Sequence, residues 1–300
     1  MPATSMSGPA QLRQLIASKR MVLAPGAYDC ITARLIEQAG FTAVYMTGAG
    51  TSAAHGYPDF GLVTMSEMVA NARRIVDTLG IPLISDADTG YGNELNVFRT
   101  VQEFERAGVA AIHLEDQGFP KKCGHLDDKE IIPLDDYLAK IRAASGARRS
   151  KDFMIIARTD SRAVKGFEQA VTRGNAALAA GADMVFLEAP QTMAEIEQVP
   201  KLIKGPCLLN VVQGGKTPPI DMQTAEKFGY ALAIVPGLLV RTVLEACDEA
   251  LKHLKETGKN PETRFKTTVR QYFNRFGADE WDTRRTAYRG NAPKKSEAAE

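Results

Sequence analysis

Cysteine, long apolar runs and an excess of one charge are all scarce in this chain of 300 residues. Its four cysteines are too few and too scattered for a secreted disulfide scaffold, so we expect a reducing compartment. The longest apolar run, 230–240, contains a proline and falls short of the roughly 20 residues of a membrane span. The 37 basic and 36 acidic side chains nearly cancel, which argues against nucleic-acid binding. The first residues lack the apolar core of a signal peptide. Together these absences predict a cytoplasmic protein.

Short apolar runs rich in β-branched residues alternate with stretches whose apolar residues have helical spacing. Eight such runs predict strands, at 21–24, 43–46, 82–85, 110–114, 154–157, 184–187, 207–210 and 232–235. Predicted helices include 136–144, 167–180 and 237–254. Eight strands alternating with helices favour a (β/α)8 TIM barrel, which usually takes about 250 residues. The alternative, an open doubly wound sheet, would need a glycine fingerprint after the first strand, and the sequence there is APGAYD.

The chain is predicted to consist of one catalytic domain with short additions. We expect a frayed start over 1–8, the barrel over 9–256, a helical appendage over 257–290 and a disordered tail over 291–300. The appendage holds the only tryptophan, Trp281, and several other aromatic residues. An apolar appendage on a closed barrel is expected to pack on a neighbouring subunit.

Polar residues follow the predicted strands at their carboxyl ends, where TIM barrels place their active sites. Three pairs have i, i+2 spacing, so both members of each pair can point to one side of the strand: Asp86 and Asp88, His113 and Glu115, Arg158 and Asp160. Other strand ends carry Tyr45, Thr47, Glu188 and Asn210. Any one of these residues could be an ordinary strand-end cap, but their joint occurrence predicts an active site.

Three carboxylates, Asp86, Asp88 and Glu115, predict a hard-oxygen metal site suited to Mg²⁺ or Mn²⁺ rather than to tetrahedral zinc. Arg158 offers a planar fork for a substrate carboxylate. The glycine-rich segment 47–61 could bring backbone N–H groups close to an anion, or it could be a flexible loop.

The segment KKCGH at 121–125 lies in the long loop after the fourth predicted strand. Lysines and a histidine beside Cys123 predict a lowered thiol pKa, and such loops often serve as lids. The alternative is a chance cysteine in a basic loop. Cys30, Cys207 and Cys247 are expected to be core residues.

These motifs resemble those of the isocitrate lyase/phosphoenolpyruvate mutase superfamily over about residues 8–255. The resemblance is greatest to its short lyase branch, which includes enzymes of the 2,3-dimethylmalate lyase, 2-methylisocitrate lyase and petal-death types. The matching segments are YMTGAG, GYPDFG, SDADTGYG, HLEDQ, KKCGH, ARTD, FLEAP and LNVVQGGKTP.

The resemblance implies a barrel that exchanges its last helix between subunits, a homotetramer, bound Mg²⁺ or Mn²⁺, and an α-oxo or α-hydroxy carboxylate substrate. It implies that Asp88 binds the metal directly, while Asp86 and Glu115 hold it mostly through waters. It also implies that Cys123 is a proton donor. Other residues that it places at the site are Lys121, His125, Tyr45, Thr47, Gly48, Ala49, Asp59, Gly124, Arg158, Glu188 and Asn210.

From the resemblance we predict a Mg²⁺-dependent carbon–carbon lyase that cleaves a 2-alkylmalate-type diacid, such as 2,3-dimethylmalate, to a 2-oxo acid and a carboxylic acid. Lyases specific for 2-methylisocitrate commonly read KRCGHR, whereas this chain has Lys122 and Leu126 at the two arginine positions. A cation expected near a third carboxylate is therefore absent, which favours a dicarboxylate. The cysteine of this loop argues against carbon–phosphorus chemistry.

Several alternatives stay open at the level of sequence. The enzyme alternatives are 2-methylisocitrate lyase, oxaloacetate hydrolase, oxaloacetate decarboxylase and a Schiff-base aldolase, although no lysine falls at an obvious strand end. A catalytically silent barrel that binds small diacids is the non-enzyme alternative. We expect small di- or tricarboxylates as binding partners, and neither nucleic acid nor a membrane.

Overall fold

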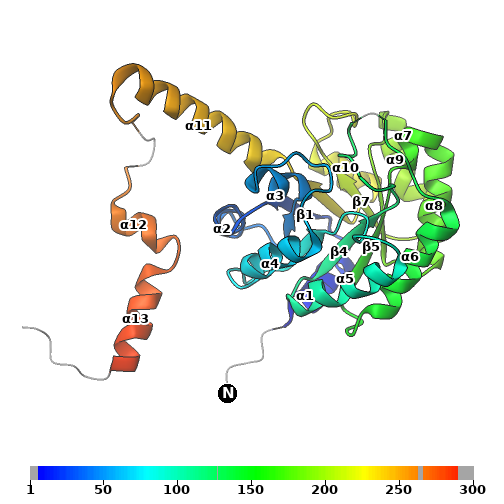
Figure 1. Cartoon of the computed structure of the whole chain (residues 1–300), viewed down its shortest axis with the longest axis horizontal. Coiled ribbons are helices and arrows are strands. Elements are labelled where there is room, and N and C mark those ends of the chain that lie inside the picture. The colour runs from blue at the N-terminus through cyan, green and yellow to red at the C-terminus, as the bar shows by residue number, and fades with distance from the viewer. Residues whose placement is uncertain (1–5, 127, 263–265, 290–300) are drawn as a thin grey trace, which may run out of the picture. The chain divides into compact units, whose positions relative to one another are not determined.

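Eight parallel strands close into one barrel in chain order in the computed structural model, which describes residues 6–126, 128–262 and 266–289. Each strand pairs with the next, and β8 returns to pair with β1. The strands are β1 Val22–Ala27, β2 Val44–Met46, β3 Leu83–Asp86, β4 Ala111–Glu115, β5 Met154–Thr159, β6 Met184–Leu187, β7 Cys207–Asn210 and β8 Leu232–Val235 (Figure 1). Every predicted strand is found within a few residues, and the predicted TIM barrel is confirmed.

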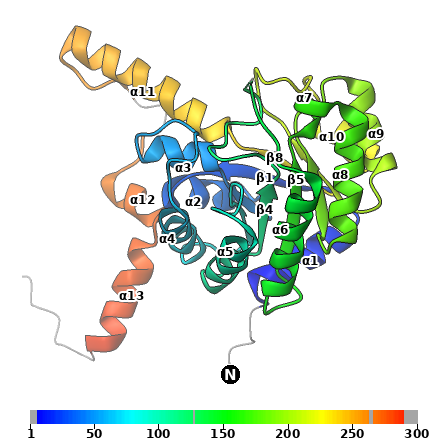
Figure 2. The ribbon, with the colours of Figure 1, turned by 45° about the vertical axis from the view of Figure 1, so that its right-hand side comes forward.

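Helices α1 to α10 lie outside the strands and cover the barrel (Figures 1 and 2). Those that end by residue 228 are α1 Gly8–Ala17, α2 Cys30–Gln38, α3 Gly48–Ala54, α4 Met65–Val76, α5 Glu94–Arg106, α6 Leu134–Ala147, α7 Ser161–Lys165, α8 Phe167–Ala179, α9 Met193–Leu202 and α10 Met222–Phe228. The last three are α11 Leu238–Thr257, α12 Val269–Asn274 and α13 Ala278–Arg289. The predicted helices at 136–144, 167–180 and 237–254 correspond to α6, α8 and α11.

Local sequence explains where the helices begin and which face they bury. Asp29 caps α2 and forms a capping box with Thr32, so the first free N–H groups of the helix are satisfied. In α5, Val97, Val101 and Phe104 recur at helical spacing and are fully buried against the barrel. This apolar stripe fixes the rotation of α5 on the barrel wall.

The barrel interior divides into an apolar half and a polar half. In the half nearer the amino ends of the strands, inward residues such as Ile84, Ile156 and Phe186 form one buried cluster with Leu12 of α1. Two residues further along the same strands, the inward positions become Asp86, Arg158 and Glu188. The apolar cluster, to which α1 contributes Leu12, fills the half of the barrel nearer the amino ends. The charged side chains are therefore confined to the carboxyl ends of the strands.

The chain divides into two compact units, Met1–Glu245 and Ala246–Glu300. The first contains the whole barrel. The second contains the rest of α11 with α12 and α13, where the ring of Tyr272 lies 5.3 Å from that of Phe273 and 5.7 Å from that of Phe276. Residues 1–5 of the predicted frayed start and the predicted tail lie outside the described residues.

The three cysteines expected in the core do not share one environment. Cys207 is buried in β7, Cys30 is half-buried at the start of α2, and Cys247 is exposed on α11. The prediction is therefore wrong for Cys247, because helical spacing alone does not show which face of α11 is covered.

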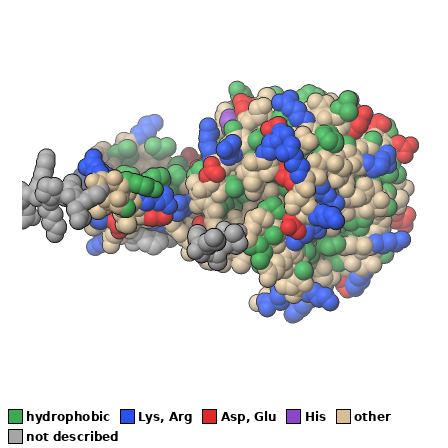
Figure 3. Space-filling view, turned by 90° about the horizontal axis from the view of Figure 1, so that it is seen from below, with side chains coloured by type: hydrophobic (Ala, Val, Ile, Leu, Met, Phe, Trp, Pro, Cys, Tyr) green, Lys and Arg blue, Asp and Glu red, His purple; other side chains and the backbone are tan. Residues whose placement is uncertain are grey.

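On the face of the first unit in Figure 3, side chains of both charges are interspersed, as the near-zero net charge suggests. None of the described helices is long and apolar enough to span a membrane.

Candidate active site

A cavity of about 500 Å³ opens at the carboxyl ends of the strands and is lined by residues of the first unit. Most of the predicted site residues line it: Tyr45, Thr47, Ala49, Asp59, Asp86, Cys123, Gly124, His125, Arg158, Glu188 and Asn210. The remaining ones contact these residues from behind: Gly48, Asp88, Glu115 and Lys121. Residues from six strand ends and two loops are thus brought together.

The carboxylates at the ends of β3 and β4 are buried and close to one another. The backbone N–H of Asp88 donates to Asp86 Oδ1 at 2.9 Å, and Asp88 itself has a left-handed φ of 48°. Burial raises the pKa of Asp88 to about 6; Asp86 and Asp59 act in the same direction, and Lys121 acts to lower it. Burial also raises the pKa of Glu115 well above its usual range. Burial therefore disfavours the charged forms of Asp88 and Glu115 in the absence of a further cation.

Asp86 differs from these two carboxylates. Burial acts to raise its pKa, but His113, Lys121 and Arg158 together lower it to about 2. Burial lowers the pKa of His113 to about 4, so the imidazole ring is neutral at pH 7. At that pH, Lys121 and Arg158 are the cations that keep the pKa of Asp86 low. Asp86 is therefore a carboxylate throughout the physiological pH range.

These residues fit a hard divalent cation that keeps several of its waters. The buried Oε1 of Glu115 lacks a hydrogen-bond partner, and the donor set is composed of oxygen atoms. No group of three or more His, Cys, Asp or Glu side chains in the described part of the chain is close enough to form a complete metal cage. Mg²⁺ is commonly held by only one or two carboxylates, so an incomplete cage is compatible with it.

Lys121 occupies the space beside these carboxylates. Its Nζ lies 2.7 Å from Asp88 Oδ1 and also contacts Asp59 Oδ1. Burial acts to lower the pKa of Lys121, but Asp88 and Glu115 raise it well above the usual value. The ammonium group is therefore held in its charged form and is a poor Schiff-base nucleophile.

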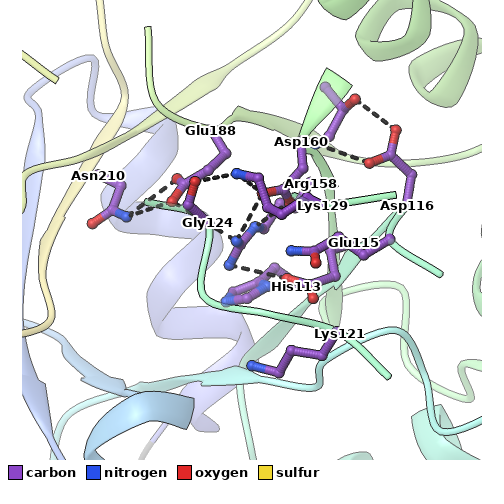
Figure 4. A network of polar contacts seen from close by, with 12 residues as sticks. His113, Glu115, Asp116, Lys121, Gly124, Lys129, Arg158, Asp160, Glu188 and Asn210 are labelled. Carbon is purple, nitrogen blue, oxygen red and sulfur yellow. Dashed lines mark hydrogen bonds and ion pairs between the residues drawn. The ribbon is translucent and has the colours of Figure 1, made fainter. Parts of the chain in front are cut away.

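Arg158 lies at the centre of a buried ionic network (Figure 4). Its Nε and Nη2 lie 3.0 and 3.3 Å from the two oxygens of Asp160, and its Nη1 lies 3.1 Å from Glu115 Oε2. The guanidinium carbon stands 5.1 Å from the centre of the Phe186 ring. These contacts fix the guanidinium plane, which suits recognition of a carboxylate.

Tyr45 and His113 form a second polar group inside the barrel. The Tyr45 hydroxyl lies 2.8 Å from His113 Nε2 and 3.4 Å from Asp86 Oδ2. Burial and the nearby Asp86 raise the pKa of Tyr45 well above its usual value, so the hydroxyl keeps its proton at pH 7. The start of α3 lies beside this group, where the Thr47 hydroxyl accepts a hydrogen bond from the Gly50 N–H.

The loop after β4 brings Cys123, Gly124 and His125 to the cavity. His125 Nε2 lies 3.4 Å from Glu188 Oε1, and its Nδ1 accepts a hydrogen bond from the Lys216 N–H. The prediction of a lowered pKa for Cys123 is wrong: burial raises it, assisted by Asp59 and Glu188. The cations nearby in sequence are engaged elsewhere, since Lys121 pairs with Asp88 and the Lys122 Nζ donates to Asp128 O. The thiol is therefore protonated at neutral pH.

Some residues of the network were not among the predicted site residues. Lys129 is buried against Asp160, and Arg173 pairs with Asp116 at 2.9 Å. His113 stands at a strand end in the sequence, and only the structure shows its contact with Tyr45. No sequence signal marks Lys129, because it lies in the loop and its partner is 31 residues away.

Comparison with known proteins gives a consistent result. The family model for phosphoenolpyruvate phosphomutase matches residues 12–255. The chain is 48% identical to a 2,3-dimethylmalate lyase of Eubacterium barkeri, over 83% of this chain and 87% of that protein. It is 41% identical to a 2-methylisocitrate lyase of Aeropyrum pernix, over 91% of this chain and 88% of that protein.

Solved structures with the same fold cover nearly the whole chain. A crystal structure of 2,3-dimethylmalate lyase superposes with a TM-score of 0.91 at 39% identity, over 97% of this chain and 98% of that one. An oxaloacetate acetylhydrolase in complex with 3,3-difluorooxalacetate has a TM-score of 0.91 at 36% identity, over 96% and 99% of the two chains. A phosphonopyruvate hydrolase with oxalate and Mg²⁺ has a TM-score of 0.85 at 30% identity, over 95% and 100%.

The resemblance in the sequence motifs is thereby confirmed, together with the expectation of an enzyme of the carbon–carbon lyase type. With its eight-stranded barrel and the extent of these matches, the chain belongs to the phosphoenolpyruvate phosphomutase family, within the isocitrate lyase/phosphoenolpyruvate mutase superfamily.

Proposed function

We propose that this enzyme cleaves the C2–C3 bond of a 2-alkylmalate-type 2-hydroxy diacid, such as 2,3-dimethylmalate, to a 2-oxo acid and a carboxylic acid. The observation that carries the proposal is the joint position of Arg158, the carboxylates of β3 and β4, and a protonated Cys123 around one cavity. The identity of 48% to a 2,3-dimethylmalate lyase supports the choice of substrate class.

The first part of the proposed mechanism is substrate binding. Arg158 pairs with one substrate carboxylate, and Thr47 and Ala49 at the start of α3 line the same cavity. Asp88 would hold Mg²⁺ directly, with Asp86 and Glu115 holding it through waters. The cation would supply the charge that stabilises the anionic oxygens as the bond breaks.

The bond cleavage then needs one proton acceptor and one proton donor. The substrate hydroxyl gives its proton to Tyr45 Oη, and the hydrogen of Tyr45 passes to His113 Nε2, 2.8 Å away. The resulting alkoxide collapses to a carbonyl, the C2–C3 bond breaks, and its electron pair remains on C3. Cys123 protonates C3, and its raised pKa keeps the proton on the thiol until that step.

The cavity wall supports a dicarboxylate over a tricarboxylate. Leu126 lines the cavity and offers apolar surface to an alkyl substituent. The Lys122 ammonium donates to Asp128 O on the exposed side of the loop and does not line the cavity. Positions 122 and 126 of this loop therefore offer no cation to a third substrate carboxylate, and burying an unpaired charge is costly.

The assembly and the cellular location belong to the same proposal. We propose a cytoplasmic homotetramer that takes Mg²⁺ or Mn²⁺ and binds small di- or tricarboxylates. The exposed aromatic residues Tyr272, Phe273 and Trp281 support a contact between subunits, since such side chains are seldom left in solvent as a group.

Oxaloacetate hydrolysis is the second candidate, favoured by the TM-score of 0.91 with oxaloacetate acetylhydrolase. A panel of 2-hydroxy and 2-oxo diacids, assayed with Mg²⁺, separates the two. The lyase releases a 2-oxo acid from 2,3-dimethylmalate, whereas the hydrolase releases oxalate and acetate from oxaloacetate. Failure of the purified enzyme to turn over any 2-alkylmalate would refute the lyase proposal.

A further inference from the structure

The loop that carries Cys123 has a fixed base. Gln117 and Ile131 form an antiparallel bridge, and the Gly118 N–H donates to Glu130 O at 2.9 Å. Residues 118–130, which we call the flap, therefore leave and re-enter the barrel through one short ribbon. Motion of the flap relative to the cavity has to occur between these two ends.

The tip of the flap lies close against the cavity floor. A Cβ atom on Gly124 would stand 2.2 Å from Glu188 Oε1 and 2.5 Å from Arg158 Nη2. A side chain at position 124 would therefore force Glu188 and Arg158 to shift. The flap is therefore closed in this structure, with its backbone in contact with the residues proposed to bind substrate.

One lysine links the closed tip to the ionic network below it. Lys129 is 8% exposed, and its Nζ donates both to the backbone carbonyl of Gly124 and to Asp160 Oδ1, the latter at 3.1 Å (Figure 4). Asp160 is in turn the residue that accepts from two nitrogens of Arg158. A single carboxylate thus binds both the flap lysine and the substrate-binding arginine.

We propose that Lys129 is a positioning residue that couples closure of the flap to the orientation of Arg158. With the flap closed, Lys129 binds Gly124 O and shares Asp160 with Arg158; with the flap open, the contact between Lys129 and Asp160 is lost. The inference rests on the proposed function only in the roles given to Arg158 and Cys123.

Charge supports this arrangement. Asp160 is fully buried between two cations, and although burial acts to raise its pKa, Arg158 and Lys129 hold that pKa below the usual value. A buried carboxylate is destabilised when one of its two cationic partners leaves. Flap opening and the orientation of Arg158 are therefore energetically linked. The alternative is that Lys129 merely neutralises Asp160 and has no effect on the flap.

The accessibility of Cys123 tests the coupling without any substrate. In Lys129→Met, peptide-resolved labelling by iodoacetamide should modify Cys123 at least about tenfold faster than in the unaltered enzyme, because opening exposes the thiol. Cys30 and Cys247 lie outside the flap and should label at unchanged rates. The matched control is Lys122→Met, which removes a half-buried lysine of the same flap whose ammonium donates to Asp128 O at the exposed side; Cys123 labelling should not change.

Steady-state kinetics test whether Lys129 also affects the orientation of Arg158. Lys129→Met should raise KM for the diacid by about tenfold or more, since a misplaced Arg158 binds carboxylate poorly. The effects of Lys129→Met and Asp160→Asn on KM should be less than multiplicative in the double variant, because both act through one contact. Lys129→Arg, which retains the charge, should restore part of the loss. If the methionine variant does not fold, Lys129→Gln retains one donor and should show intermediate labelling.

Cys123 labelling and KM both within about twofold of the unaltered enzyme would overturn the proposal. Faster labelling at Cys123 with an unchanged KM would also overturn it, since the flap would then move without Arg158. If the unaltered enzyme has no lyase activity but Lys129→Met still exposes Cys123, the proposed function fails and the link between Lys129 and the flap stands.

Discussion

The hydroxyl of Tyr45 lies 2.8 Å from Nε2 of His113, and both side chains are buried among the apolar residues of the barrel interior. Their rings stack with centroids 5.7 Å apart and planes at 20°. The proposed mechanism uses the tautomer in which Nε2 accepts, so that the tyrosine hydrogen points toward His113 and the oxygen lone pairs stay available to the substrate hydroxyl. This orientation gives Tyr45 its proposed role with the substrate hydroxyl.

Tyr45→Phe should therefore lower kcat by about 10²-fold, since a positioned proton-transfer group is lost while ring packing is kept. The matched control is Tyr230→Phe, which removes a buried hydroxyl that donates to Ile196 O away from the cavity. That control should cost about 1 kcal/mol of stability and leave kcat unchanged. Equal activity of the two variants would contradict the role of Tyr45.

Removal of the metal should abolish turnover. We expect EDTA treatment to inactivate the enzyme and Mg²⁺ or Mn²⁺ to restore activity, because the crowded carboxylates need a compensating cation. Asp88→Ala should abolish turnover and weaken Mg²⁺ binding in calorimetry. Near-normal activity after exhaustive chelation would refute the metal site.

Cys123→Ser should reduce the lyase rate by about 10²–10⁴-fold without unfolding the protein, since a hydroxyl is a far weaker acid than a thiol. The raised pKa of Cys123 also predicts the direction in which the cleavage rate changes with pH. The donor is the protonated thiol, which is present below its pKa and lost above it. The cleavage rate should therefore fall at alkaline pH, at a pH above the pKa of an ordinary thiol, and Cys123→Ser should lack this limb.

Substrate selectivity should follow from the wall at Leu126. We expect kcat/KM for 2,3-dimethylmalate to exceed that for 2-methylisocitrate by at least about tenfold, or ~1.4 kcal/mol. Leu126→Arg should narrow the gap by providing a cation for the third carboxylate. A preference of the unaltered enzyme for the tricarboxylate would overturn the substrate choice without affecting the metal site or Cys123.

The buried pair of Arg173 and Asp116 should matter for stability. Arg173→Met leaves the Asp116 carboxylate buried without its cation, and we expect a loss of about 3–5 kcal/mol in urea unfolding. Lys201→Met breaks an exposed pair with Glu197 and should change stability by about 1 kcal/mol or less. Similar losses in both variants would contradict the importance of burial.

The fold and much of the candidate site could be predicted from sequence because both depend on local spacing. The i, i+2 spacing at strand ends is enough to predict inward positions for Asp86, Glu115 and Arg158, because side chains two residues apart on a strand share a face. The environment of Cys123 could not be predicted in this way. Its pKa depends on burial and on where Lys121 points, and Lys121 pairs with Asp59, which lies 62 residues away. Sequence neighbours are poor guides to the charges around a loop residue.

The flap contributes charge as well as shape to the cavity. Lys121 and Lys129 both belong to it, and both ammonium groups are buried against site carboxylates when it is closed. Lifting the flap withdraws two positive charges and leaves Arg158 facing the carboxylates of β3, β4 and β6. An open cavity of this composition attracts a cation more strongly than an anion. With the proposed metal and substrate, we would expect the metal ion to bind first, the dianionic substrate second, and the flap to close last.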